Sequence, residues 1–274
     1  MQELKLLMSK IRSYIRIGRP SDAVRPMLFF LLGVLVVGKG PVLLPILSLF
    51  FLSMAVVAYN DICDYDIDRI SNKQRPLMHH MSIWEAQLLA MVYAIISLIL
   101  LPWPIFPYWL IIAFLGFAYS RWKLSYDPFL AAIILILCNI VLPLFAGEAS
   151  ITHGLPVNHT VLIFAAFFAL LSFCVGPYKD YKDIEGDRGV GKRTFFTMFK
   201  QRDVVFALTI GSTVVLGLFI WWLSTFMDFR VTLLIGFLML LTQLGMLRGQ
   251  MRALIVLLII EGHALLLAVL SHYL

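Results

Sequence analysis

Two short segments of the chain each carry three aspartates at positions i, i+3 and i+7. On an α-helix, which turns about 100° per residue, these positions lie within about 60° of one another and share one face, whereas Asp66 and Glu185 point elsewhere. Carboxylates without an accompanying His or Cys favour Mg²⁺, which usually binds few carboxylates together with water and phosphate oxygens. The two rows therefore predict two Mg²⁺ sites, one built from Asp61, Asp64 and Asp68 and one from Asp180, Asp183 and Asp187.

The two acidic segments form an internal repeat. With an offset of 119 residues (180 minus 61), six residues of the first segment coincide with identical residues of the second. A solvated acidic helix end, neutralised by neighbouring Arg and Lys, would explain one such row, but two rows with the same spacing argue against it. The repeat spans four predicted helices and suggests two similar four-helix halves plus one helix. The identical pairs are Tyr59 and Tyr178, Asp61 and Asp180, Asp64 and Asp183, Asp68 and Asp187, Arg69 and Arg188, and Lys73 and Lys192.

Basic residues interleaved with the acids indicate an anionic substrate. A diphosphate held by metal ions and by these cations is a good leaving group, and its departure needs no general base. If it leaves an allylic carbon, an apolar bundle would shelter the carbocation and aromatic rings would stabilise it. The glycines at 186, 189 and 191 lack P-loop spacing and are interpreted as helix-ending and turn residues. The basic residues are Arg69, Lys73, Lys182, Arg188 and Lys192.

The composition is that of an integral membrane protein. Of 274 residues, 61% are hydrophobic and 14% are charged, and the mean hydropathy is +0.91, whereas soluble domains have about 25% charged residues. The net charge of +6 comes from basic residues in short loops between apolar runs, which argues against a nucleic-acid partner. The three cysteines have no paired spacing, so neither a disulfide framework nor a zinc site is expected.

Apolar runs long enough to cross a bilayer predict an all-α bundle of about nine transmembrane helices. Residues 1–20 are basic and amphipathic and predict an interfacial helix on the membrane lipids. With the N-terminus in the cytoplasm, 20 of the 22 Lys and Arg residues fall on the cytoplasmic side, which also places the long charged loops 61–83 and 179–202 there. The predicted spans are 24–40, 41–60, 84–101, 107–120, 128–147, 159–178, 203–226, 230–247 and 252–272.

These segments resemble the UbiA superfamily of intramembrane prenyltransferases over essentially the whole chain. The segment NDICDYDID, from Asn60 to Asp68, is similar to its NDxxDxxxD motif and continues as DRxxxKxRP through Arg75 and Pro76. The second acidic segment looks like its DxxDxxxD motif, and YSRWK resembles its YxxxK element through Tyr119 and Lys123. One departure follows Pro76, where MHHMS replaces a turn with Pro and Gly; its adjacent His79 and His80 point in different directions and are given no catalytic role.

The resemblance implies one prenyltransferase domain, residues 1–274, in which two Mg²⁺ ions hold an isoprenyl diphosphate. Asn60 would join the first metal cluster and the diphosphate site, and Tyr119 and Lys123 would contact the diphosphate. With Arg69, these two residues form the expected catalytic set. Lys73, Lys182, Arg188 and Lys192 would complete the diphosphate site.

The acceptor stays open at this level. Family members prenylate aromatic acids and quinone precursors, tetrapyrroles, haem or glycerol-phosphate lipids. An aromatic or quinone precursor is expected, with a glycerol-phosphate lipid or another hydroxyl acceptor as the alternative. Arg16, Arg19 and Arg25 either bind an acidic acceptor or only mark the cytoplasmic side. A divalent-cation transporter is a remote alternative, because both acidic rows face one side of the membrane, and a lipid-binding scaffold would not need the acidic motifs.

Overall fold

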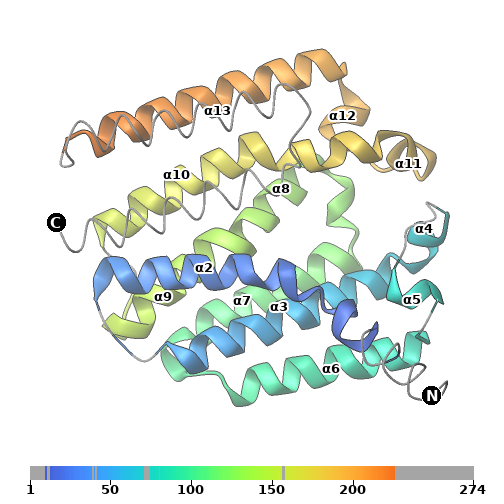
Figure 1. Ribbon diagram of the computed structural model, residues 1–274, viewed down its shortest axis with the longest axis horizontal. Coiled ribbons are helices and arrows are strands. Elements are labelled where there is room, and N and C mark those ends of the chain that lie inside the picture. Colours follow the sequence, from blue (N-terminus) through green and yellow to red (C-terminus); the bar gives the residue numbers. More distant parts are fainter. Residues whose placement is uncertain are drawn as a thin grey trace, which may run out of the picture. The chain divides into compact units, whose positions relative to one another are not determined.

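The computed structural model describes residues 10, 13–38, 40, 42–70, 75–79, 81–155 and 158–225. Within these ranges every regular element is helical and there is no strand. Contacts group the chain into two compact units, Met1–Ser125 with Leu137–Pro156, and Tyr126–Ile136 with Val157–Leu274. Each unit is described by itself below, and its elements can be followed in Figure 1.

The first unit is built from long apolar helices joined by short helical turns. Two short helices follow α3, the first of which carries Asp68, and the π-helical turn η3 leads into the last long helix. Its elements are α2 (Pro20–Val37), α3 (Leu43–Cys63), α4 (Tyr65–Ile70), α5 (Pro76–His79), α6 (Ile83–Ile99), η1 (Trp103–Ile105), α7 (Phe106–Arg121), η3 (Leu137–Val141) and α9 (Leu142–Thr152), with the 3₁₀ turn η2 (Leu124–Tyr126) after α7.

Glycines allow α2 and α9 to pack backbone against backbone. A Cβ at Gly33 would collide with the carbonyl oxygen of Leu144, and a Cβ at Gly147 would collide with that of Phe30. Small residues at such contacts are common between membrane helices, because close approach increases van der Waals contact where no hydrophobic effect operates. The backbones of α2 and α9 therefore lie in direct contact at these two glycines.

A buried polar cluster joins α3, α6 and α7. The Ser48 hydroxyl donates to the Ser97 carbonyl at 2.8 Å, and the Ser97 hydroxyl donates to the Ser48 carbonyl at 2.7 Å. The Trp109 indole N–H donates to the Ser97 hydroxyl at 2.7 Å. Because unsatisfied polar groups are costly in an apolar surrounding, these bonds favour one register of the three helices.

The second unit contains two long helices packed through aromatic rings. Phe167 and Phe219 stack with ring centroids 3.7 Å apart, and Phe164 contacts Phe219 and Trp222. Between the long helices the chain makes three short helical elements, and the second acidic row lies in the first two of them. The elements are α8 (Pro128–Ile136), α10 (His159–Val175), η4 (Gly176–Asp183), α11 (Ile184–Gly189), α12 (Phe195–Met198) and α13 (Gln201–Leu223).

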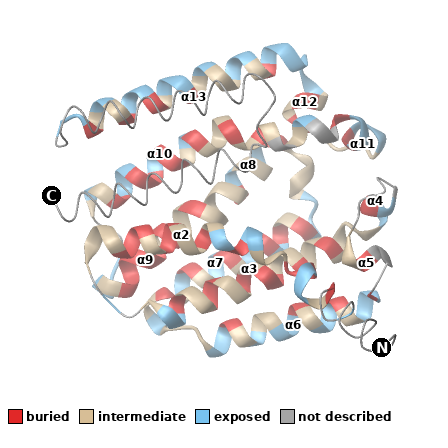
Figure 2. Ribbon diagram, viewed as in Figure 1, coloured by how far each residue is buried: buried red, intermediate tan, exposed pale blue. Residues whose placement is uncertain are grey.

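The helices confirm an all-α, multi-pass membrane architecture. Six described helices are long and apolar enough to cross a membrane, and Ile83–Ile99 is a shorter apolar helix. These seven agree with the first seven predicted spans, while 230–247 and 252–272 lie outside the described residues. Large apolar side chains such as Trp103, Leu218 and Trp221 are exposed, as a lipid-facing surface requires, and Figure 2 shows exposed positions along the long helices.

The fifth predicted span differs from expectation in its middle. The helix runs from Pro128 to Thr152, but the π-helical turn Leu137–Val141 interrupts it. A boundary between the two compact units falls at Leu137, where this turn begins. A π turn inserts an extra residue into the helical repeat, which no hydropathy pattern reveals. This boundary between the two compact units therefore lies inside the span, whereas the internal repeat places the boundary between its two four-helix halves before the span. The single domain spanning 1–274 stays a prediction.

Candidate functional site

The first acidic row lies where α3 passes into α4. The helix ends at Cys63, yet the Asp64 N–H still donates to the Asn60 carbonyl at 2.9 Å, and the Asp68 N–H donates to the Asp64 carbonyl at 2.8 Å. The turn at Asp64 therefore keeps the helical spacing. Asp61 and Asp68 are only 1% and 3% exposed, whereas Asp66 is exposed, in agreement with the face predicted from the spacing.

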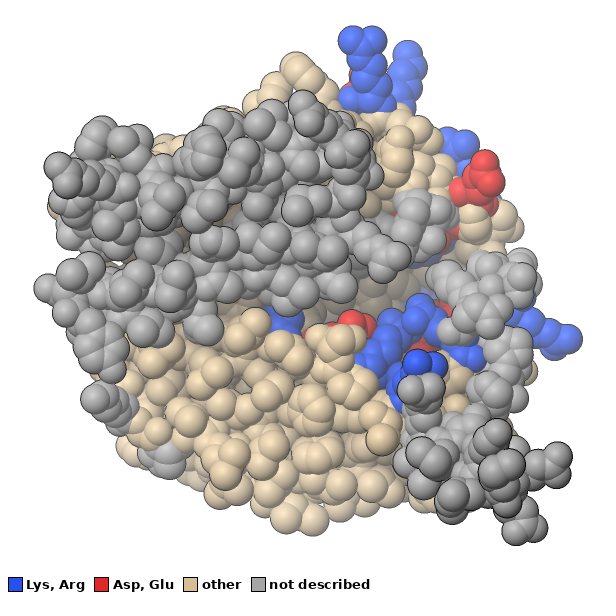
Figure 3. Space-filling model, in the orientation of Figure 1, with Lys and Arg blue, Asp and Glu red and all other residues tan. Residues whose placement is uncertain are grey.

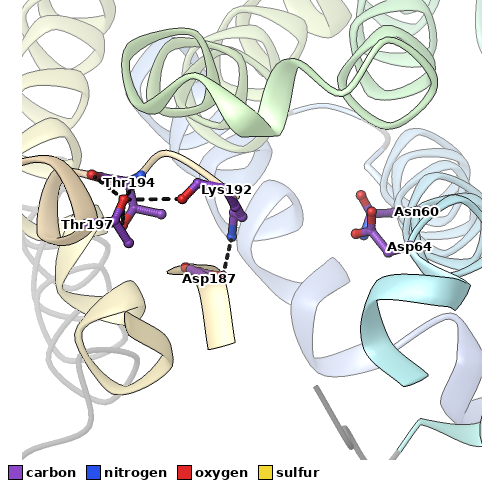
Figure 4. Close-up of polar contacts among 6 residues, drawn as sticks. All are labelled: Asn60, Asp64, Asp187, Lys192, Thr194 and Thr197. Carbon is purple, nitrogen blue, oxygen red and sulfur yellow. Dashed lines mark hydrogen bonds and ion pairs between the residues drawn. The ribbon is translucent and has the colours of Figure 1, made fainter. Parts of the chain in front are cut away.

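Each aspartate of the first row has a nitrogen partner in the first unit. Arg19 forms an ion pair with Asp61, and the Arg75 Nε lies 3.3 Å from the Asp68 Oδ2. The Asn60 amide donates to the Asp64 Oδ2 at 2.9 Å, as Figure 4 shows. The row is thus held in place by groups from α2, from the segment before α5 and from α3 itself.

The ion pair between Arg19 and Asp61 was not predicted from the sequence, which gave Arg19 no role distinct from the other two basic residues near the first span. Arg19 has a φ of 40° and lies at the N-cap of α2. The segment that carries it is tied to α6, because the Tyr14 hydroxyl donates to Glu85 at 2.8 Å and the Tyr93 hydroxyl donates to the Tyr14 carbonyl at 2.9 Å. The two residues are 42 positions apart in the sequence, and no spacing pattern reveals this pair.

Two buried carboxylate oxygens of the acidic rows mark where a cation fits. The Oδ2 atoms of Asp61 and Asp187 are buried and, among the described residues, have no hydrogen-bond partner. Buried polar atoms are nearly always satisfied, so each is suited to a metal ion. No group of three or more His, Cys, Asp or Glu residues close enough to share a metal occurs in the described part of the chain. A Mg²⁺ ion here would rely on few carboxylates, with water and phosphate completing its coordination, as is usual for Mg²⁺.

The second acidic row does not lie on the α-helix that the spacing predicts. Asp180 lies in the 3₁₀ helix η4, which ends at Asp183, and Asp187 lies in α11. Residues i and i+3 eclipse one another in a 3₁₀ helix, so backbone positions 180 and 183 still share a face. Asp187 is 5% exposed, and its Oδ1 lies 3.3 Å from the Lys192 Nζ.

A hydrogen-bonded loop holds Lys192 beside Asp187. The Lys192 N–H donates to the Asp187 carbonyl at 2.9 Å, and the Thr197 hydroxyl donates to the Lys192 carbonyl at 3.2 Å (Figure 4). Thr194 and Thr197 form a reciprocal cap at the start of α12. The predicted role as helix-ending or turn residues agrees for Gly189, where α11 ends, and for Gly191, which has a φ of 70°, whereas Gly186 lies inside α11.

The YxxxK element lies at the end of α7 in the first unit. Tyr119 is half-buried, whereas Lys123 is exposed and has a φ of 52°, in the left-handed region. Between them, the buried Ser120 hydroxyl donates a hydrogen bond to the side-chain amide oxygen (Oδ1) of Asn60 at 3.0 Å. Ser120 was not singled out from the sequence, and its place inside YSRWK was the only available signal.

Charged residues gather at particular ends of each unit. On the face in Figure 3 they lie toward α4 and α5 in the first unit and toward α11 and α12 in the second, and most of the remaining described surface is without charge. Arg69 and Arg188 are both exposed. Of the other predicted residues, Lys73 and His80 and the side chains of His79, Lys182 and Asp183 lie outside the described residues.

The motifs and the helical bundle have counterparts in known proteins. Residues 26–258 match the sequence model of the UbiA prenyltransferase family. The chain belongs to this family. It is therefore a prenyltransferase, and its apolar helices make it an integral, multi-pass membrane protein.

Members of the UbiA family from archaea and plants are among its relatives. This chain is 28% identical over 241 residues to a digeranylgeranylglyceryl phosphate synthase of Pyrococcus horikoshii, and the match covers 83% of this chain and 81% of the relative. It is 27% identical to homogentisate phytyltransferase 1 of Arabidopsis thaliana, and that match covers 70% of this chain and 50% of the relative. A UbiA homologue of Archaeoglobus fulgidus, solved with GPP and Mg²⁺, has the same fold, with a TM-score of 0.71 and 17% identity over 95% of this chain and 98% of the other.

Proposed function

We propose that this prenyltransferase moves an isoprenyl group from a prenyl diphosphate to a lipophilic acceptor and that Mg²⁺ is required, with one ion for each acidic row. The observation that carries the proposal is the pair of buried carboxylate oxygens without partners, on Asp61 and on Asp187. The Mg²⁺-bound homologue of the same fold supports it. The proposed metal ligands are Asn60, Asp61, Asp64, Asp68, Asp180, Asp183 and Asp187.

The charges of the chain fit this chemistry. When bound, Mg²⁺ would neutralise the diphosphate and make it a better leaving group. Lys192 is already held beside the second row and would contact the diphosphate without a large rearrangement. The apolar helices would exclude water from the carbocation that forms. We assign Lys73, Lys182, Arg188 and Lys192, with Asn60, to diphosphate binding, and Arg69, Tyr119 and Lys123 to the departing group.

Two acceptor classes remain candidates. The Pyrococcus protein is named for a glyceryl phosphate and the Arabidopsis protein for homogentisate, an aromatic acid. The match to the former covers more of both chains, which favours a glyceryl phosphate ether as the acceptor. The aromatic acceptor expected from the sequence stays the second candidate.

An acceptor screen would test the proposed function. Purified, lipid-reconstituted protein would be given Mg²⁺, radiolabelled prenyl diphosphates of several lengths, and either glyceryl phosphate ethers or aromatic acids. We expect a lipid-soluble product with one class of acceptor, and none when Mg²⁺ is removed by a chelator. If no donor and acceptor pair gave a product with folded protein, prenyl transfer as proposed here would be refuted.

We further propose that both acidic segments face the cytoplasm, as the distribution of Lys and Arg indicates. Single cysteines would be placed at Arg69, at Arg193 and at His153, all of which are exposed, in a protein without its native cysteines. We expect an impermeant maleimide to label the first two from the cytoplasmic side and the third from the opposite side. Labelling of His153 and Arg193 positions from one side would contradict this topology.

A further inference from the structure

Three contacts line up along the interface between α3 and α7. A Cβ at Gly116 would lie 2.6 Å from the Val56 Cγ1, so the two helices approach closely at this level. The rings of Tyr59 and Phe117 stack, with centroids 5.2 Å apart. One helical turn beyond the Gly116 contact, Ser120 meets Asn60. This register brings a buried hydroxyl of α7 to the residue that begins the first acidic motif.

The hydrogen bonds around Asn60 have only one consistent direction. The Asp64 carboxylate accepts hydrogen bonds, so the Asn60 nitrogen must face it, at 2.9 Å. The Asn60 oxygen then faces Ser120, whose hydroxyl donates to it at 3.0 Å. Ser120 is 5% exposed, and its hydroxyl also lies 3.3 Å from the Gly116 carbonyl of its own helix. The hydroxyl therefore satisfies the Asn60 oxygen and helps to hold the amide in the orientation that its bond to Asp64 requires.

We propose that Ser120 is a positioning residue for the first acidic row, acting through Asn60 on the carboxylate of Asp64. The inference rests on the proposed function, since it concerns the row that would hold Mg²⁺. In this arrangement the Asn60 nitrogen donates to the row, and the Asn60 oxygen, which accepts from Ser120, keeps a second lone pair for the proposed metal ion. Groups that orient a metal ligand typically change metal affinity by about 10- to 100-fold when they are removed.

Removing the hydroxyl tests the relay. In Ser120→Ala the Asn60 oxygen loses its donor, so the amide is free to turn and its bond to Asp64 weakens. We expect the Mg²⁺ concentration for half-maximal activity to rise about 10-fold, with a smaller change in kcat at saturating Mg²⁺. Ser120→Thr and Ser120→Val form a matched pair of equal shape, and only Thr keeps the hydroxyl, so Thr and not Val should retain the wild-type requirement. This pair decides the question if the alanine variant does not fold.

Metal binding without turnover gives an independent readout. Mn²⁺ would be titrated into purified protein and the bound fraction measured by electron paramagnetic resonance. We expect weaker binding in Ser120→Ala than in wild type, and no further loss when Ser120→Ala is added to Asn60→Ala, because both changes break the same relay. Ser53→Ala is the control and should bind Mn²⁺ as wild type does, since within the described part of the chain the Ser53 hydroxyl bonds only the Leu49 carbonyl of the same helix, at 2.9 Å.

The outcomes separate the inference from the proposed function. If wild-type protein bound no Mn²⁺, both the metal role of the acidic rows and the role of Ser120 would be refuted. If wild type bound Mn²⁺ and the Ser120 variants bound it equally well, only the inference would be overturned. Additive losses in the double variant with Asn60→Ala would also overturn it, because Ser120 would then not act through Asn60.

Discussion

Replacing Asp64 with asparagine is expected to abolish prenyl transfer while leaving the protein folded. The change removes one negative charge and one oxygen ligand from the row that we assign to Mg²⁺. Asparagine has nearly the shape of aspartate, so packing around the turn at Asp64 is preserved. Because removing even a group that orients a metal ligand lowers affinity or activity by about 10- to 100-fold, loss of a ligand is expected to lower turnover by at least about 100-fold.

Asp66→Asn is the matched control for Asp64→Asn. It removes the same charge two residues away, from a side chain that is exposed and turned away from the buried face of the row. Turnover of this variant should stay close to that of wild type, measured at saturating donor and Mg²⁺. An equal loss of turnover in both variants would refute the assignment of the metal-binding residues by the helical face on which they lie. Insertion and the thermal midpoint would be compared for both proteins.

Lys123→Met should lower kcat by about 100-fold, the usual effect of removing one group that stabilises developing negative charge. Lys123 lies at the end of α7, apart in sequence from both acidic segments, and we assign it to the departing diphosphate. An interaction that strengthens as the C–O bond breaks lowers the barrier more than it improves binding of the donor. The donor affinity should therefore change little, and Lys123→Arg should recover part of the turnover because the charge is kept while the geometry differs.

Lys123→Gly separates the charge from the fold. Lys123 has a φ of 52°, a region that costs a side-chain-bearing residue about 1 kcal/mol and that glycine enters freely. The glycine variant should thus lose turnover as Lys123→Met does, while the native backbone at the end of α7 is not disfavoured. If instead Lys123 only marks the cytoplasmic side, a correctly inserted Lys123→Met protein would turn over at a near-normal rate, which would remove Lys123 from the active site.

The amino-acid sequence by itself determined the class of the protein, the first seven spans and the acidic rows. These features are local. A run of apolar residues favours the bilayer whatever its neighbours are, and the i, i+3, i+7 spacing keeps Asp61, Asp64 and Asp68 on successive turns even though the helix changes at Asp64. The sequence also predicted that Asp66 lies off the shared face, where the structure finds it exposed, and that Gly191 lies in a turn.

Only the tertiary structure decided which groups hold the rows. Arg19 reaches Asp61 across 42 residues, and Ser120 reaches Asn60 across 60. Such pairs depend on which helices pack together and in what register, and that choice is made by contacts such as Gly116 on Val56 and not by hydropathy. The 3₁₀ helix that ends at Asp183 and the π turn inside 128–152 were also missed, because each differs from an α-helix in its backbone hydrogen bonding, which the spacing of residue types does not reveal.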